Sequence, residues 1–393
     1  MNLMEASNQW ATRPDDERFW TLNDMLAAAT EYREAAEERT YSPGALQVCQ
    51  TGDTGLALRS RNEPKSGNGF FSHYSLRQLN TLVQGPTRND AFARIPAELA
   101  ARNLNWALEN YKGEETKVLW NKRTQTARAF TSTGYGRIWN DTIIKKLLPL
   151  LGQGWQVPPA RPSGSGDLRA RPATAADVMA SRNRAGGGAG IQVGDPIAPA
   201  GLYLSEKDMF AFLVNESRPI NGGGKLPLYR GFFIGNSEVG DKAFWVMSFL
   251  YNMVCGNHIV WDATKVERIR IVHRGEDAGA RAFKHLAVEL TRYSDASASA
   301  TEQRIVASQS FLLGKDASEV IQTLYDKGIA PKGVLADAHV KATEHPDDGA
   351  NCSPNSAWGM AQGLTRLSQD CKHADERVKL DIAAGKVLDT VPF

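Results

Sequence analysis

The spacing of hydrophobic and polar positions divides the chain into helical ends and a strand-rich middle. Helical spacing occurs over residues 15–39, 96–111, 278–293, 300–313, 317–327, 355–369 and 373–388. Short apolar runs typical of strands occupy the middle, over residues 201–215, 228–240 and 268–273. Because strands and helices do not alternate, the pattern predicts an α+β fold with a central, mostly antiparallel sheet and helices at both ends of the chain.

A β-hairpin is predicted at residues 117–130, where two short runs flank the turn-like segment 121–124. Alternation places Val118, Trp120 and Lys122 on one face of its first strand. The next segment leads into an amphipathic helix that Asp141 is able to cap. The hairpin is assigned to the β-rich core of the chain.

These elements predict four regions. Residues 1–112 form a mainly helical N-terminal region, 113–156 and 202–293 a central β-rich core, and 294–393 a C-terminal helical region. The remaining stretch, 157–201, is rich in Pro, Gly and Ala and carries five arginines against three aspartates. With few large apolar side chains it cannot bury much surface, so it is predicted to be a flexible basic insertion. It is either an arm that touches nucleic acid or simply an exposed insertion.

Charge is distributed unevenly, although the net charge is only +2. The first forty residues are rich in Asp and Glu, whereas residues 117–146 contain seven Lys and Arg side chains and one acid, Asp141. A local cationic excess suits a polyanionic partner such as nucleic acid, and it equally suits a solvated surface. Charge alone leaves both interpretations open.

No membrane span is expected. Residues 243–261 form a run of nineteen residues without formal charge, which nearly reaches the length of a spanning helix. Ser248, Asn252, Asn257 and His258 interrupt this run, so it is predicted to be a buried strand pair. The four cysteines lie far apart and the first residues lack the layout of a signal peptide, which favours a reducing, cytoplasmic location.

The sequence predicts no catalytic, metal or cofactor site. Cys255 and His258 are spaced like ligands, but the sequence offers neither a third ligand nor an activating base beside them. Cys255 lies in the most apolar part of the chain and is predicted to be core, while the role of His258 stays open. The glycine-rich segments lack the pattern of a phosphate-binding loop, because Lys225 is followed by Leu226 and Pro227.

The hairpin region combines aromatic side chains with cations, which is the combination that single-strand binding requires. Cations neutralise phosphates, and aromatic rings stack on bases. The predicted nucleic-acid-binding residues are Lys117, Trp120, Lys122, Arg123, Arg128, Tyr135, Arg137, Trp139 and Arg230. The competing interpretation is that the aromatic rings belong to the core of the hairpin.

Five stretches carry a resemblance to a known family: STGYGRIWND (132–141), GNSEVGDKAF (235–244), VCGN (254–257), IVHRG (271–275) and NSAWGMAQGLTR (355–366). In this order they resemble the phage/plasmid-like proteins, a domain of unknown function found on phages, prophages and conjugative plasmids. The resemblance spans residues 117–390. It implies a mobile-element protein of the bacterial cytoplasm and assigns no catalytic residue. This chain has Glu238 where the family commonly has a histidine.

The leading interpretation is a non-enzymatic nucleic-acid-binding protein that acts on single-stranded DNA in replication or recombination, with assembly into a homo-oligomer as a companion hypothesis. An analogy with phage single-strand annealing proteins supports this interpretation at the level of fold only. One alternative is an enzyme that acts on nucleic acid or a small molecule through a polar pocket formed by Asn236, Glu238, Asn257, His258 and His273. Another is an adaptor that binds a host protein through its acidic N-terminal helix.

Overall fold

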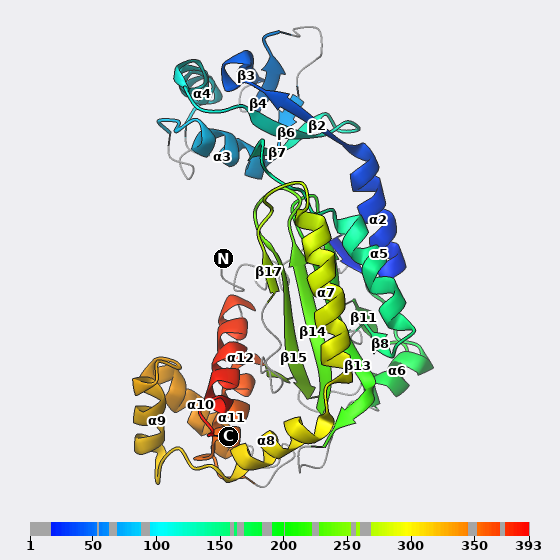
Figure 1. The fold of residues 1–393 in the computed structure, drawn as a ribbon, viewed down its shortest axis with the longest axis vertical. Helices are drawn as coiled ribbons and strands as arrows, with labels where there is room; N and C mark the ends of the chain where they lie inside the picture. The colour runs from blue at the N-terminus through cyan, green and yellow to red at the C-terminus, as the bar shows by residue number, and fades with distance from the viewer. Residues whose placement is uncertain are drawn as a thin grey trace.

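The structure is a computed structural model that describes residues 17–392, except for 53–54, 63–68, 88–94, 158–160, 163–168, 183–190, 200, 222–227, 253–256, 260–268, 345–351 and 370–373. Its parts follow one another along the long axis of the molecule (Figure 1). A six-stranded N-terminal sheet lies at one end, an eight-stranded central sheet in the middle, and a group of C-terminal helices at the other end. This arrangement confirms the α+β fold with a large, mostly antiparallel sheet.

The central sheet is built around three long antiparallel strands. These are β13 (Met209–Ile220), β14 (Leu228–Asn236) and β15 (Phe244–Asn252). Short strands extend it: β12 (Leu202–Leu204), β1 (Arg18–Phe19) and β8 (Trp155–Gln156) on the β13 side, and β16 (Asn257–Ile259) and β17 (Ile269–Ile271) on β15. The strands predicted at 201–215, 228–240 and 268–273 are therefore confirmed, and the uncharged run 243–261 contains the antiparallel pair β15–β16.

Side chains of the central strands alternate between two buried apolar layers, as the pleat of a strand requires. Leu213, Phe232 and Ile234 face the layer that includes α2 (Leu22–Ala35), α5 (Asn140–Leu151) and α7 (Ala278–Asp295). Phe212 and Phe233 face the opposite layer. The sheet thus provides a rigid body against which the neighbouring helices pack.

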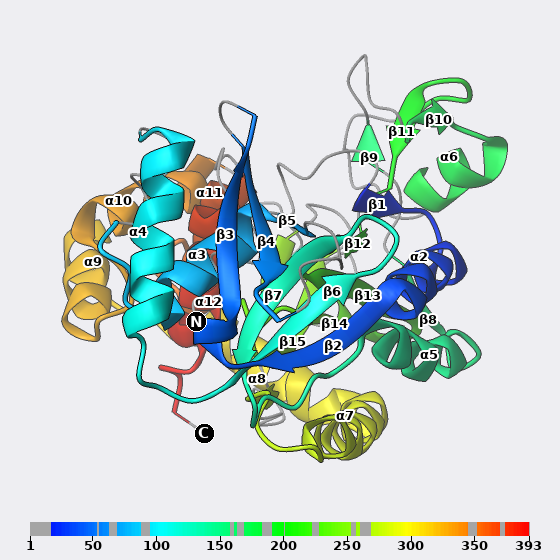
Figure 2. The same cartoon turned by 90° about the horizontal axis from the view of Figure 1, so that it is seen from above.

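The N-terminal sheet contains the hairpin predicted at 117–130. Its strands are β2 (Ala36–Tyr41), β3 (Leu46–Thr51), β4 (Gly55–Ser60), β5 (Gly69–Phe71), β6 (Thr116–Asn121) and β7 (Thr126–Ser132), in the order β2-β6-β7-β5-β4-β3. A short 3-10 helix, Pro43–Ala45, links β2 to β3. Helices α3 (His73–Leu82) and α4 (Ala97–Asn110) cover one face, and β2 lies at the edge opposite β3 (Figure 2).

Two expectations about this region need correction. Residues 1–112 contribute four strands of the N-terminal sheet in addition to helices α2, α3 and α4, so the region is mixed and its strands were missed. The hairpin also belongs to this sheet and not to the central one. The physical reason is that β2 has the sequence AEERTY, whose Glu, Arg and Ala favour a helix. Its strand conformation comes from pairing with β6, from Ala36–Asn121 to Tyr41–Thr116, which are distant in sequence.

The insertion at 157–201 is also more ordered than its composition predicts. Within its described residues it forms a three-stranded sheet of β9 (Arg161–Pro162), β10 (Arg171–Pro172) and β11 (Pro196–Ala198), with α6 (Ala175–Arg182). Trp20 packs against its small apolar cluster and donates its indole N–H to Arg169 O at 3.2 Å. The cluster depends on a tryptophan outside the insertion, so its composition alone could not reveal it.

The C-terminal region is helical, as predicted. It contains α8 (Ala298–Ser310), α9 (Ala317–Asp326), α10 (Lys332–Glu344), α11 (Ala357–Gln369) and α12 (Ala374–Leu388). Helix α10 was not predicted. Helices α9, α11 and α12 fall within the predicted ranges, and α8 overlaps the range 300–313 but begins two residues earlier. These helices share an apolar core in which Trp358, Leu324 and Leu335 are buried. Within the described part of the chain, no helix is long and apolar enough to cross a membrane.

Candidate nucleic-acid interface

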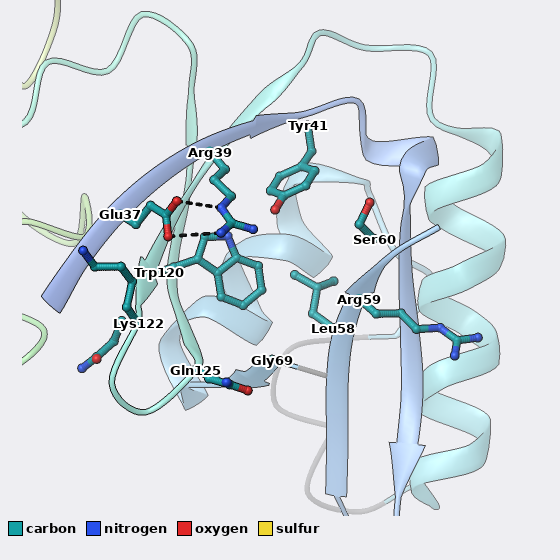
Figure 3. Close-up of a pocket in the computed structure, with 11 residues that line it drawn as sticks. Glu37, Arg39, Tyr41, Leu58, Arg59, Ser60, Gly69, Trp120, Lys122 and Gln125 are labelled. Carbon is teal, nitrogen blue, oxygen red and sulfur yellow. Dashed lines mark hydrogen bonds and ion pairs between the residues drawn. The ribbon is translucent and has the colours of Figure 1, made fainter. Parts of the chain in front are cut away.

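A cavity of about 310 Å³ opens on the N-terminal sheet and reaches from β2 across to β4 (Figure 3). Its lining comes from β2 (Glu37, Arg39, Tyr41), β4 (Leu58, Arg59, Ser60), β5 (Gly69), β6 (Trp120, Asn121) and the hairpin turn (Lys122, Gln125). Small-molecule sites have volumes of about 300 Å³ and more, so the cavity is large enough to hold a ligand group. Two residues of the predicted interface, Trp120 and Lys122, lie in it.

The indole of Trp120 fits into the cavity because residue 69 on β5, which lies beyond β7 in the sheet, has no side chain. Its indole crosses from β6 towards β5, where a Cβ on residue 69 would lie 2.1 Å from the indole Cζ3. Glycine at position 69 therefore leaves room for the indole ring. The residue opposite Trp120 on β7 is Ala127, which is also small. The indole is half-buried and adds an aromatic surface to the cavity beside Tyr41 and Leu58.

The charged groups of the cavity are arranged around this aromatic surface. Arg39 donates two hydrogen bonds to Glu37, from Nε to Oε1 at 3.0 Å and from Nη2 to Oε2 at 3.2 Å, and these bonds raise the pKa of Arg39. Lys122 is exposed at the start of the hairpin turn. The guanidinium of Arg59 points away from the cavity and donates to Gln47 Oε1 at 2.8 Å (Figure 3). Two cations and one carboxylate thus surround the opening.

Arg128 and Arg230 do not lie on a binding surface, and their predicted contact with phosphates is wrong. Their exposed fractions are 2% and 3%. Arg128 pairs with Glu238 at 3.1 Å, and Arg230 donates to Ala296 O at 2.9 Å. A register shift between β6 and β7 leaves Arg128 without a residue directly opposite and re-aims its side chain, which alternation along an ideal hairpin does not predict.

Arg123, Arg137 and Trp139 lie near the hairpin but already have partners from the acid-rich N-terminal segment. Arg123 lies 3.7 Å from Glu31 and 3.6 Å from Glu34. Arg137 donates to Glu38 at 2.8 Å. The guanidinium of Arg33 stacks on the Trp139 ring at 3.6 Å. The acidic and basic segments of the sequence therefore neutralise each other, and the hairpin is not a bare cationic surface.

Tyr135 and Lys117 belong to the junction between the two sheets. Tyr135 donates its hydroxyl to Ser237 O at 3.2 Å, and its ring stacks on His273 with the centroids 5.0 Å apart. Burial raises the pKa of Tyr135 well above its usual value. Lys117 donates to the carbonyl oxygen of Tyr135 at 3.3 Å. A ring already stacked on an imidazole is not open to a base, so Tyr135 serves the junction in this arrangement.

Sequence reasoning missed Arg39 and Tyr41, which complete the cavity. Both lie on β2, where Arg39 is the last residue of the predicted helix 15–39 and Tyr41 lies just beyond it. A period of two did place Glu37, Arg39 and Tyr41 on one face. That signal was short and was masked by the helix-favouring composition around it.

The polar residues of the enzyme hypothesis come together only in part. Asn236 donates to Ile138 O and Asn140 Oδ1, and Glu238 accepts the N–H of Asn140 at 2.9 Å. His273 accepts the N–H of Ile138 at Nδ1, 3.4 Å away, and burial lowers its pKa to about 4. We call this group, Arg128, Asn140, Asn236, Glu238 and His273, the polar junction.

The polar junction holds segments together and offers little access to a substrate. Asn236, Glu238 and His273 are at most 5% exposed. Three of the stretches that carry the family resemblance, 132–141, 235–244 and 271–275, meet here. For Asn257 and His258 only the backbone in β16 is described, and Cys255 lies outside the described residues. The enzyme hypothesis therefore gains no open pocket from the described side chains.

Comparisons with protein-family models, with curated proteins and with solved structures found no match to this chain. The resemblance to the phage/plasmid-like proteins stays a prediction from sequence motifs. Within the described residues, no group of three or more His, Cys, Asp and Glu side chains is placed to hold a metal ion.

Proposed function

We propose that the protein binds single-stranded nucleic acid at the cavity of the N-terminal sheet. A base would stack on Trp120 beside Tyr41, and the phosphates next to it would lie near Arg39 and Lys122. The observation that carries the proposal is the aromatic surface of Trp120 within a base-sized cavity that has cations at its opening. Stacking of this kind needs an unpaired base, so single strands are favoured over duplexes.

The motif resemblance extends the proposal to a biological setting. A phage- or plasmid-encoded protein in the bacterial cytoplasm that covers single-stranded DNA would act in replication or recombination. The small number of cations at the cavity restricts the electrostatic part of binding. Arg39 is already bonded to the Glu37 carboxylate, so Lys122 is the cation counted here, and one neutralised phosphate predicts a slope of log K against log salt concentration of about −0.7.

The proposal is tested by titrating a fluorescent oligothymidine and the matching duplex with the protein over a series of salt concentrations. We expect the single strand to bind more tightly, and Trp120→Leu to weaken its binding about fivefold to a hundredfold, because a stacked base contributes about 1–3 kcal/mol. Trp120→Phe keeps an aromatic face and retains most of the affinity. Lys122→Ala reduces the magnitude of the salt slope by about 0.7.

Matched controls separate the cavity from the rest of the surface. Trp106 on α4 is 60% exposed and lies outside the cavity, so Trp106→Leu leaves binding unchanged. Lys112 is also exposed and serves as the control for Lys122. If no salt-dependent binding occurs, the proposed function is wrong. Equal effects of Trp106→Leu and Trp120→Leu would mean that nucleic acid binds elsewhere.

A further inference from the structure

The two edges of the N-terminal sheet differ in a way that points to a partner. At the β3 edge, Asn105 of α4 accepts the N–H of Val48 and donates to its carbonyl oxygen, both at 2.8 Å. That side chain occupies backbone groups that a further strand would need. The β2 edge has no such cover: β2 pairs with β6 on one side, and no described strand pairs with its other side. An uncovered edge is a template for another strand.

The backbone groups that face this open edge follow from the register. Lys122 N–H donates to Ala35 O at 2.7 Å, directly before the pair Ala36–Asn121. Hydrogen-bonded pairs alternate along an antiparallel ladder. Glu37, Arg39 and Tyr41 therefore bond inward to β6, and the N–H and C=O groups of Glu38 and Thr40 point outward.

We propose that the β2 edge pairs antiparallel with the β2 edge of a second copy of this chain. Glu38 would lie opposite the partner subunit's Glu38, so that outward-facing groups meet each other. In this register Glu37 lies opposite the partner subunit's Arg39, and Arg39 opposite the partner subunit's Glu37. The two N-terminal sheets become one continuous sheet with both cavities open on the same face.

Charge complementarity selects a second copy as the partner. Glu37 and Arg39 are on the same face of β2, two residues apart, so a twofold axis at Glu38 forms two opposite-charge pairs at once. Glu38 does not add an uncompensated repulsion, because each Glu38 is bonded to Arg137 of its own chain. The same charges would oppose an apolar strand from an unrelated protein. The inference is independent of nucleic-acid binding.

The test is sedimentation velocity without nucleic acid, using two charge variants alone and mixed. We expect wild-type protein to dimerise. Glu37→Arg alone and Arg39→Glu alone each place like charges opposite one another twice, which weakens the dimer about tenfold or more. An equimolar mixture of the two variants restores dimers, because every facing pair is then of opposite charge. Restoration by mixing cannot come from damage to either fold.

A backbone variant tests the same edge without altering charge. Thr40→Pro removes an outward N–H and leaves the inward ladder intact, whereas Thr40→Val keeps the N–H and serves as control. We expect dimers of the valine variant only, with the same circular dichroism for both. Wild-type protein that stays monomeric at all soluble concentrations overturns the inference. So does a dimer that persists in both charge variants, or a mixture that fails to pair.

Discussion

At the scale of one residue, Glu238 shows how a buried polar side chain is stabilised by partners in the interior. The carboxylate is 1% exposed, and its two oxygens accept from Arg128 and from the backbone N–H of Asn140. A carboxylate at this position is required by the buried cation that faces it. The charge of Glu238 balances that of Arg128.

Removing the charge of Glu238 should destabilise the protein strongly. Glu238→Gln keeps an acceptor for Asn140 but leaves Arg128 buried without its counter-ion, and breaking a buried pair in this way costs about 3–5 kcal/mol. Urea unfolding measures the loss. The double variant Arg128→Met, Glu238→Gln should recover part of it, because no unpaired charge remains.

An exposed ion pair provides the control for Glu238. Arg102 and Glu98 on α4 form a pair with side chains 76% and 62% exposed. Arg102→Met should change the free energy of unfolding by less than about 0.5 kcal/mol. A loss in Glu238→Gln as small as in this control would show that the junction is open to water.

His273 should make stability depend on pH between about 6.5 and 4. Burial lowers its pKa from 6.5 to about 4, so the unfolded chain takes up the proton first as the pH falls. The contribution of His273 is complete above pH 6.5 and is lost as the pH falls towards 4, by up to about 3 kcal/mol. His273→Asn keeps an acceptor for Ile138 N–H and does not titrate, so its unfolding free energy should vary less over this range.

The control for His273 is the exposed His285 on α7. His285→Asn should retain the pH dependence of the wild-type protein, measured by urea unfolding at closely spaced pH values. Equal flattening by both substitutions would contradict the assignment to His273.

At the scale of elements, the sequence predicts the helices and strands whose own residues carry the hydrophobic pattern. The central strands, the hairpin and most C-terminal helices follow from periodicity, since their own side chains form the buried layers. Strands β2 to β5 could not be found this way. They are short, half of the residues in β2 are charged, and their pairing depends on β6 and β7. These strands form because of contacts between segments that are distant in sequence.

The candidate site follows the same division. Trp120 and Lys122 were identified because aromatic and cationic residues alternate within the hairpin itself. Arg128 and Arg230 were assigned wrongly because their burial depends on Glu238 and on the end of α7, which are remote in sequence. Arg123 and Arg137 had acidic partners that composition placed in a separate region. Residue types therefore indicated the kind of site, but the sequence did not reveal which group pairs with each cation.

At the scale of the whole molecule, the N-terminal sheet is inserted into a body that is otherwise continuous. The chain leaves that body at the end of α2 and returns at the start of α5. These two points lie close together, since Arg33 on α2 stacks on Trp139 directly before α5. The main apolar core of the N-terminal sheet uses only residues between Tyr41 and Phe130, and the core around the central sheet uses none of them.

This separation predicts that the central body folds without the N-terminal sheet. Replacing residues 37–134 with a short Gly-Ser linker leaves the central and C-terminal apolar cores complete, and Glu238→Gln is added because Arg128 is removed. The shortened chain should therefore unfold cooperatively, with a smaller urea m-value because less surface is exposed. It should also lose single-strand binding, because the cavity is removed entirely. Full-length Trp120→Leu is the matched variant, since it loses binding while the sheet is kept. A shortened chain that binds single strands as wild type would place the interface on the central body, and one that cannot fold would make both sheets a single folding unit.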